Sequence, residues 1–165
     1  MTHTATLESF ERQFPNASKV ADMQNPYWFF NTDESEIEGE GAYIEMLNRS
    51  VIAAWGDCNG NGAERTLNKP KDGDRIFYFL AGTGIIASGK VFGLAFQANT
   101  IFRQAGEFHR TVVELIDRRR NPLTTKEVRE VTGYHLPAKK IVCQMWHKGG
   151  VEHIARCFGN DTKKA

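Results

Sequence analysis

The feature that most constrains this fold is a pair of apolar segments separated by a short glycine-containing join. Residues 75–81, RIFYFLA, and 84–96, GIIASGKVFGLAF, are rich in the Ile, Phe, Tyr and Val that β-strands favour. The join, Ala81-Gly82-Thr83-Gly84, holds two glycines, which suit either a plain turn or a close approach of backbone to a ligand. The sequence therefore predicts two paired strands at the centre of the domain.

The rest of the chain predicts helices and strands in an irregular order. Helices are expected at 5–14, early in 42–56, at 122–134 and at 149–158, and strands at 25–34, Val51–Trp55, 109–119 and 139–146. The helix at 122–134 should begin at Thr124 or Thr125 and stop at Gly133. This order lacks regular βαβ alternation, so it predicts an α+β domain around a small, mostly antiparallel barrel.

The length of 165 residues predicts a single domain over 1–165, with a core at about 25–158 and a frayed tail at 159–165. No window is long and apolar enough for a membrane span, and the N-terminus does not resemble a secretory signal. Three widely spaced cysteines do not form a disulfide framework. We therefore expect a cytoplasmic protein that does not bind membranes.

Two motifs point to metal or acid–base chemistry. Cys143-x3-His147 and His153-x3-Cys157 supply zinc-type ligands, but their spacing is unusual and both cysteines suit core positions. The carboxylate-rich loop 33–40, with His109, is the basis for an alternative reading as a hydrolase or nuclease. Because that spacing is unusual and glycine-broken acidic loops are usually solvated, neither motif is predicted to be functional. The sequence therefore predicts no metal site, no cofactor and no catalytic residue.

Charge is distributed unevenly along the chain. The first 62 residues hold 10 acidic and 3 basic side chains, a formal charge of −7, whereas residues 63–165 hold 10 acidic and 18 basic ones, a formal charge of +8. The second part of the chain could therefore form a basic face that contacts phosphates, with the arginine run 118–120 as its last member. The predicted phosphate-binding residues are Lys69, Lys71, Arg75, Lys90, Arg118 and Arg119.

Aromatic residues concentrate on the predicted strands. Side chains alternate along a strand, so Trp28 and Phe30 should share one face and Tyr27 and Phe29 the other. Trp28 lies close in sequence to Asn31 and Thr32, and Trp55 ends another predicted strand before polar residues. An aromatic wall beside amide and hydroxyl groups suits a flat ligand with polar edges, such as a nucleobase.

In this order, these segments resemble the PUA-like superfamily, and within it the EVE and YTH-type domains. The resemblance covers about residues 25–145 and depends on YWFFNT at 27–32, VIAAWG at 51–56, GDRIFYF at 73–79 and GIIASGKV at 84–91. It implies a mostly antiparallel β pseudo-barrel with flanking helices that takes up a flipped, often methylated base in an aromatic pocket. On the matching positions, the implied pocket residues are Trp28, Asn31, Thr32, Trp55, Tyr78, Phe79, Gly82 and Gly84.

The sequence thus predicts a module that binds DNA or RNA without catalysis and stacks a flipped base, modified or unmodified. Two alternatives stay open. One is a protein-interaction subunit that meets an effector protein in a restriction or defence system, and the other is the small hydrolase or nuclease described above.

Overall fold

The computed structural model describes residues 26–32, 41–56, 62–133, 142–144, 150 and 152–158. The predicted helix at 5–14, the acidic loop 33–40, His147 and the tail 159–165 lie outside the described residues. None of the helices in the described ranges is long and apolar enough to cross a bilayer.

The described elements match the predicted order closely. A further helix covers 152–158, within the predicted helix at 149–158, and a short helix lies within the polar segment 57–74. The labelled elements are β1 (Tyr27–Asn31), α3 (Ala42–Arg49), β2 (Val51–Ala54), α4 (Ala63–Leu67), β3 (Arg75–Leu80), β4 (Gly84–Gln97), β5 (Phe108–Asp117), β6 (Leu123–Thr124), α5 (Thr125–Thr132) and β7 (Val142–Gln144).

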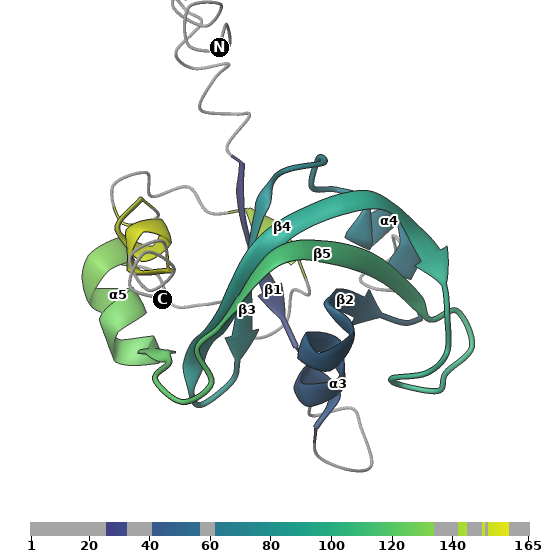
Figure 1. Ribbon diagram of the computed structural model, residues 1–165, viewed down its shortest axis with the longest axis horizontal. Helices are drawn as coiled ribbons and strands as arrows, with labels where there is room; N and C mark the ends of the chain where they lie inside the picture. The colour runs from purple at the N-terminus through teal and green to yellow at the C-terminus, as the bar shows by residue number, and fades with distance from the viewer. Residues whose placement is uncertain are drawn as a thin grey trace, which may run out of the picture.

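These strands form one seven-stranded sheet in the order β2-β5-β4-β3-β1-β7, with β6 paired to β4. All of its pairs are antiparallel except β1 and β3, which run parallel. The sheet curls so far that β3 and β2 come into contact, although β4 and β5 lie between them in the strand order. The contact is a 2.8 Å hydrogen bond that the hydroxyl of Tyr78 on β3 donates to the carbonyl of Val51 on β2. Figure 1 shows β4 and β5 as a long curved pair above α3 and β2. The predicted α+β class with a mostly antiparallel pseudo-barrel is confirmed.

Two apolar cores lie on opposite faces of this sheet. Phe30 and Tyr78 belong to the first core, which α3, α4 and β2 complete. Phe29 and Phe77 belong to the second, together with side chains from α5 and the 152–158 helix, including Phe158 at 5.8 Å from the Phe77 ring. Trp28 packs on the first core and Tyr27 on the second, as strand alternation predicts.

The glycines between β3 and β4 have local roles in the fold. Gly82 has φ +82°, and a Cβ there would meet no atom within 4 Å, so it serves the turn. Gly84 pairs with Thr124 on β6, and a Cβ at Gly84 would overlap the carbonyl oxygen of Leu123. The expectation that a ligand comes close to Gly84 is therefore corrected, because the backbone beside Gly84 is the chain's own sixth strand. A ligand contact at Gly82 stays a prediction.

Local sequence signals fix the ends of α5. The Thr124 hydroxyl accepts a 3.1 Å hydrogen bond from the Glu127 N–H, and the Glu127 carboxylate lies 3.0 Å from the same hydroxyl. Gly133 ends the helix with φ 73° in the left-handed region. Both predicted ends are confirmed, because the threonine cap and the glycine stop depend only on neighbouring residues.

Candidate nucleic-acid interface

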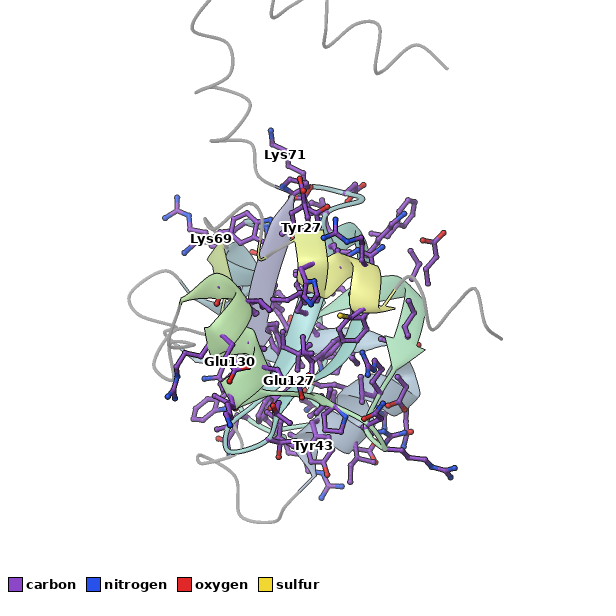
Figure 2. All side chains as sticks on the ribbon, turned by 90° about the vertical axis from the view of Figure 1, so that its left-hand side faces the viewer. Tyr27, Tyr43, Lys69, Lys71, Glu127 and Glu130 are labelled. Atoms are coloured by element: carbon purple, nitrogen blue, oxygen red, sulfur yellow. The ribbon has the colours of Figure 1, made fainter. Side chains whose placement is uncertain are left out.

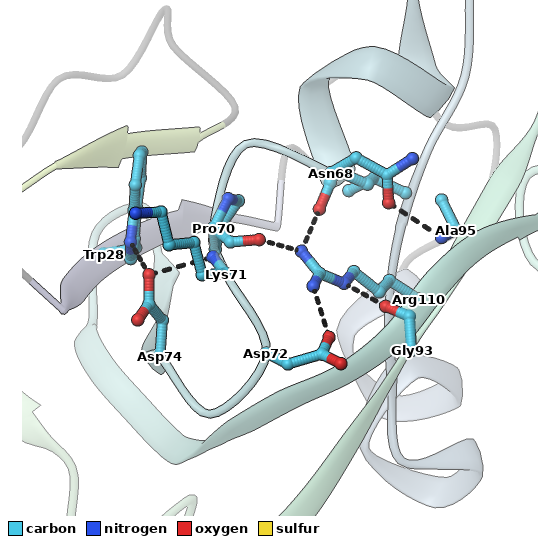
Figure 3. A network of polar contacts seen from close by, with 10 residues as sticks. Trp28, Asn68, Pro70, Lys71, Asp72, Asp74, Gly93, Ala95 and Arg110 are labelled. Atoms are coloured by element: carbon cyan, nitrogen blue, oxygen red, sulfur yellow. Dashed lines mark hydrogen bonds and ion pairs between the residues drawn. The ribbon is translucent and has the colours of Figure 1, made fainter.

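A half-buried tryptophan is tied to the loop that precedes β3. The indole Nε1 of Trp28 donates a 2.9 Å hydrogen bond to Oδ2 of Asp74, and the same oxygen accepts the backbone N–H of Lys71 at 2.9 Å. The parallel pairing of β1 with β3 makes this possible, because it places Trp28 opposite Ile76, two residues beyond Asp74. Figure 3 shows the three residues joined at this carboxylate.

Arg110 anchors the same loop from β5. Its buried guanidinium donates to the carbonyls of Gly93, Leu67 and Pro70 at 2.8, 2.8 and 2.5 Å, and to the Asp72 carboxylate at 3.1 Å. Three of these four acceptors lie in residues 67–72, so one side chain sets the path of the loop (Figure 3).

Asn68 adds a second anchor, because its side-chain oxygen accepts the N–H of Ala95 at 2.8 Å. Further along, the Gly73 N–H donates to the Val91 carbonyl at 2.8 Å. The segment 68–73 therefore runs beside β4 from Ala95 back to Val91. Lys69 and Lys71 are exposed on this fixed loop.

Arg75 and Lys90 continue this basic end of the molecule. They face each other across β3 and β4, and Arg75 also donates a 3.1 Å hydrogen bond to the Ser88 hydroxyl. Lys90 forms a 3.1 Å ion pair with Glu114, in which both side chains are largely exposed. Figure 2 shows Lys69, Lys71 and Tyr27 toward the end of the molecule opposite Tyr43. Four of the six predicted phosphate-binding residues thus gather at one end.

Arg118 and Arg119 lie elsewhere. They come directly after Asp117, the last residue of β5, which pairs with Ala87 on β4. Ala87 is three residues before Lys90, a distance of about 10 Å along the strand. Arg118 places its guanidinium 5.4 Å from the centre of the Phe158 ring. Arg119 forms an ion pair with Asp117 at 2.6 Å. The structure therefore does not bring these arginines together with the other four cations.

The ion pair with Arg119 also alters the acidity of Asp117. Partial burial acts to raise the pKa of this carboxyl, but hydrogen bonds from the side chain and backbone N–H of Arg119 outweigh it, and the charges of Arg119 and Arg120 add to their effect. The pKa of Asp117 is lowered as a result. Arg119 is thus already engaged by an anion of the chain itself.

Most of the remaining predicted pocket residues face inward. Asn31 and Thr32 are buried, and the Thr32 hydroxyl donates to the Phe79 carbonyl at 3.1 Å. Phe79 is 5% exposed and Tyr78 is fully buried, with burial raising the pKa of the Tyr78 hydroxyl above its ordinary value. Tyr78 is therefore a core residue that braces β3 against β2, and it does not line a surface.

Trp55 follows β2 and is half-buried, like Trp28. Both indoles pack against the first core, and neither is sealed inside it. Among the predicted pocket side chains, these two rings are the ones with solvent-reachable surface.

A buried acid–histidine pair stands out in the structure but not in the sequence. The Glu107 carboxylate accepts the backbone N–H groups of Ile101, Phe102 and Arg103 at 3.1, 2.9 and 2.8 Å, and lies 2.5 Å from Nε2 of His109. His109 is 3% exposed, so it does not reach the surface as a general base would. The spacing of Glu107 and His109, two residues apart at the start of a strand, was the available signal that they share a face.

The described ranges contain no group of three or more His, Cys, Asp or Glu side chains placed to hold a metal ion. Of the four residues in the zinc-type motifs, His153 is exposed and Cys157 is half-buried on the 152–158 helix. His147 and the side chain of Cys143 lie outside what is described.

Comparisons with known proteins are sparse. No protein-family model matches the chain, and no curated protein matches it. Among solved structures, it is similar to a chain described as "YTH domain-containing protein mmi1 and RNA complex", with a TM-score of 0.49 and 10% sequence identity. The match covers 84% of this chain and 83% of that chain.

Proposed function

We propose that this chain is a nucleic-acid-binding domain that works without catalysis. The observation that carries the proposal is the contact of Trp28 with Asp74, because it holds a half-exposed indole beside a loop with two exposed lysines. A flat aromatic surface next to positive charge can hold a base and the adjacent phosphate together.

Binding divides between two kinds of contact. Lys69 and Lys71, with Arg75 and Lys90 behind them, supply phosphate contacts that do not depend on sequence. A base that leaves the stack then packs against Trp28 or Trp55. Stacking supplies about 1–3 kcal/mol per base, which offsets the few kcal/mol that extraction costs. The strand in this proposal is DNA or RNA, and the base is methylated or unmodified.

The basic loop is tested with a double substitution, Lys69→Ala with Lys71→Ala. We expect weaker binding of a labelled oligonucleotide. The slope of log affinity against log salt should fall by about 0.7 for each lost phosphate contact with a single strand, and by about 0.9 with a duplex. The matched control is Lys126→Ala with Arg129→Ala on α5, which removes the same charge from another exposed surface. A control that weakens binding equally would show that only net charge matters.

The aromatic contact is tested with Trp28→Ala and Trp55→Ala. We expect each to weaken binding by roughly 5- to 150-fold, the equivalent of about 1–3 kcal/mol of stacking. Thermal unfolding should show that each variant stays folded at the assay temperature. If both substitutions unfold the protein, the indoles are core residues and the proposal fails.

A further inference from the structure

The outer face of β4 carries a row of exposed apolar side chains beyond the part that α5 and the 152–158 helix cover. Phe92 is 60% exposed, Leu94 78%, Phe96 45% and Val113, on the neighbouring strand, 39%. We call these four residues the β4 stripe. Single exposed apolar residues are ordinary, but four on adjoining strands mark an interaction surface.

Strand register places this stripe on the same face as the basic pair Arg75 and Lys90. Directly opposed residues in an antiparallel pair share a face. Lys90 is opposite Val113, Phe92 is opposite Thr111, and Phe96 is opposite His109, so these pairs follow one another along the sheet. From the start of β4 to its end, this face is therefore first covered by helices, then carries Arg75 and Lys90, and then exposes the aromatic rings.

The stripe is held rigidly. The N–H of Ala95 is bonded to Asn68 and the carbonyl of Gly93 to Arg110, so the open edge of β4 is fixed between the two rings. Phe96 packs 5.8 Å from the His109 ring, which Glu107 in turn holds. Phe92 and Phe96 are opposite Thr111 and His109, which are only two residues apart on β5, because the register of β4 shifts between the two rings. The rings are thus presented at a fixed spacing.

Charge around the stripe is positive after internal pairing. Of the nearby described carboxylates, Asp72 is paired with Arg110 and Glu114 with Lys90. Asp74 and Glu107 keep their charge, because they accept hydrogen bonds from N–H groups, but Lys69, Lys71, Arg75 and Arg103 outnumber them. Lys69 and Lys71 flank β4, and Arg103 lies past its end. Among the described residues, no carboxylate pairs with these three side chains. Uncompensated cations beside aromatic rings favour a polyanion with flat bases over an apolar protein partner.

The stripe ends at an open hollow with polar walls. This cavity of about 430 Å³ is lined by Gln97, Ala98, Asn99 and residues 103–107. Amide and guanidinium groups of this kind donate to base edges and phosphates. The stripe is only about two strands wide, which is narrow for a contact between two copies of the chain, since a stable interface buries about 800 Å² on each copy.

From these observations we infer that the β4 stripe is a stacking platform for single-stranded nucleic acid, on which bases lie against Phe92 and Phe96 while phosphates contact Lys69, Lys71 and Arg103. This inference rests on the proposed nucleic-acid binding and deepens it, because it names an unpaired strand as the ligand and gives it a path beyond the tryptophans. Bases within a duplex are stacked on each other, so a duplex would have to unstack more than one base before it could use these rings.

The test compares Phe92→Leu with Phe92→Tyr in fluorescence anisotropy. Leucine keeps the apolar area but removes the ring face, whereas tyrosine keeps it. We expect Phe92→Leu to bind a single strand of about 12 nucleotides roughly 5- to 150-fold more weakly, and Phe92→Tyr to retain the parent affinity. Ile44→Ala, at a 38% exposed apolar residue on α3, is the matched control and should bind like the parent protein.

Each other outcome overturns the inference in a recognisable way. If Phe92→Leu binds like the parent protein while Trp28→Ala is weakened, nucleic-acid binding stands and the stripe has no part in it. If a duplex binds as tightly as the single strand and is equally sensitive to Phe92→Leu, the stripe is not a stacking platform. If no oligonucleotide binds and Phe92→Leu changes the oligomeric state in light scattering, the stripe is a contact between copies and both proposals fail. Because Phe92 is 60% exposed, the variant should fold, and thermal unfolding checks this.

Discussion

Replacing Arg110 with methionine tests how the basic loop is held in place. The guanidinium is buried and is the shared donor to three backbone carbonyls, those of Leu67, Pro70 and Gly93. Methionine has a similar length but no donor, so these carbonyls lose their partner in a site with little water. Breaking a buried charged contact of this kind costs about 3–5 kcal/mol of the free energy of unfolding.

For a domain of this size, each kcal/mol shifts the melting temperature by about 2–4 °C. We therefore expect Arg110→Met to lower the Tm by roughly 6–20 °C in a thermal unfolding scan. Oligonucleotide affinity, measured well below that temperature, should also fall, because the segment that carries Lys69 and Lys71 loses its anchor. Arg110→Lys keeps the charge but cannot reach all of the acceptors, so both effects should be smaller.

Asp72→Ala is the matched comparison. The Asp72 side chain is 60% exposed and contacts only the outer nitrogen of Arg110, so its loss should cost less than about 1 kcal/mol. An Arg110→Met variant that unfolds at the parent temperature would refute the assigned anchoring role. A variant that is destabilised but binds oligonucleotide as the parent does would show that the position of the loop does not matter for binding.

Three further predictions concern the frame around the site. Gly84→Ala should lower the free energy of unfolding by at least about 3 kcal/mol, because a Cβ there overlaps the Leu123 carbonyl. Gly82→Ala should cost only about 1 kcal/mol, because its Cβ meets open space and only the positive φ opposes it. Equal losses in denaturant titrations would contradict this prediction. Tyr78→Phe should cost about 1–2 kcal/mol and leave nucleic-acid affinity unchanged, and a loss of affinity without a loss of stability would return this residue to the pocket. Burial raises the pKa of Tyr78 in the folded protein, so its contribution to the free energy of unfolding is complete below pH about 10 and is lost as the pH rises further. Absorbance titration should therefore show one tyrosine that ionises only as the protein unfolds, and this phase should be absent from Tyr78→Phe. Glu107→Gln should lower stability by about 1–3 kcal/mol, since an amide replaces a carboxylate that accepts three N–H groups; unchanged stability would mean that the 101–107 loop is held by other contacts.

The sequence by itself determined the features that depend on neighbouring residues. The β3–β4 hairpin, the start of α5 at its Thr124 cap and its stop at Gly133 follow from turn glycines and capping chemistry within a few positions. Strand alternation likewise separated Trp28 from Tyr27 onto opposite faces, because the side-chain period of a strand is two. The fold class followed from the order of these local elements.

Only the tertiary structure decided which of the candidate residues can form a surface. The parallel pairing of β1 with β3 brings Trp28 to Asp74, 46 positions away, and the curl of the sheet buries Tyr78 against Val51. Arg110 looked like an ordinary strand residue, yet it holds a loop some 40 positions distant. No local rule encodes these contacts, because they depend on how far the sheet twists and on which buried carbonyls remain to be satisfied once it closes.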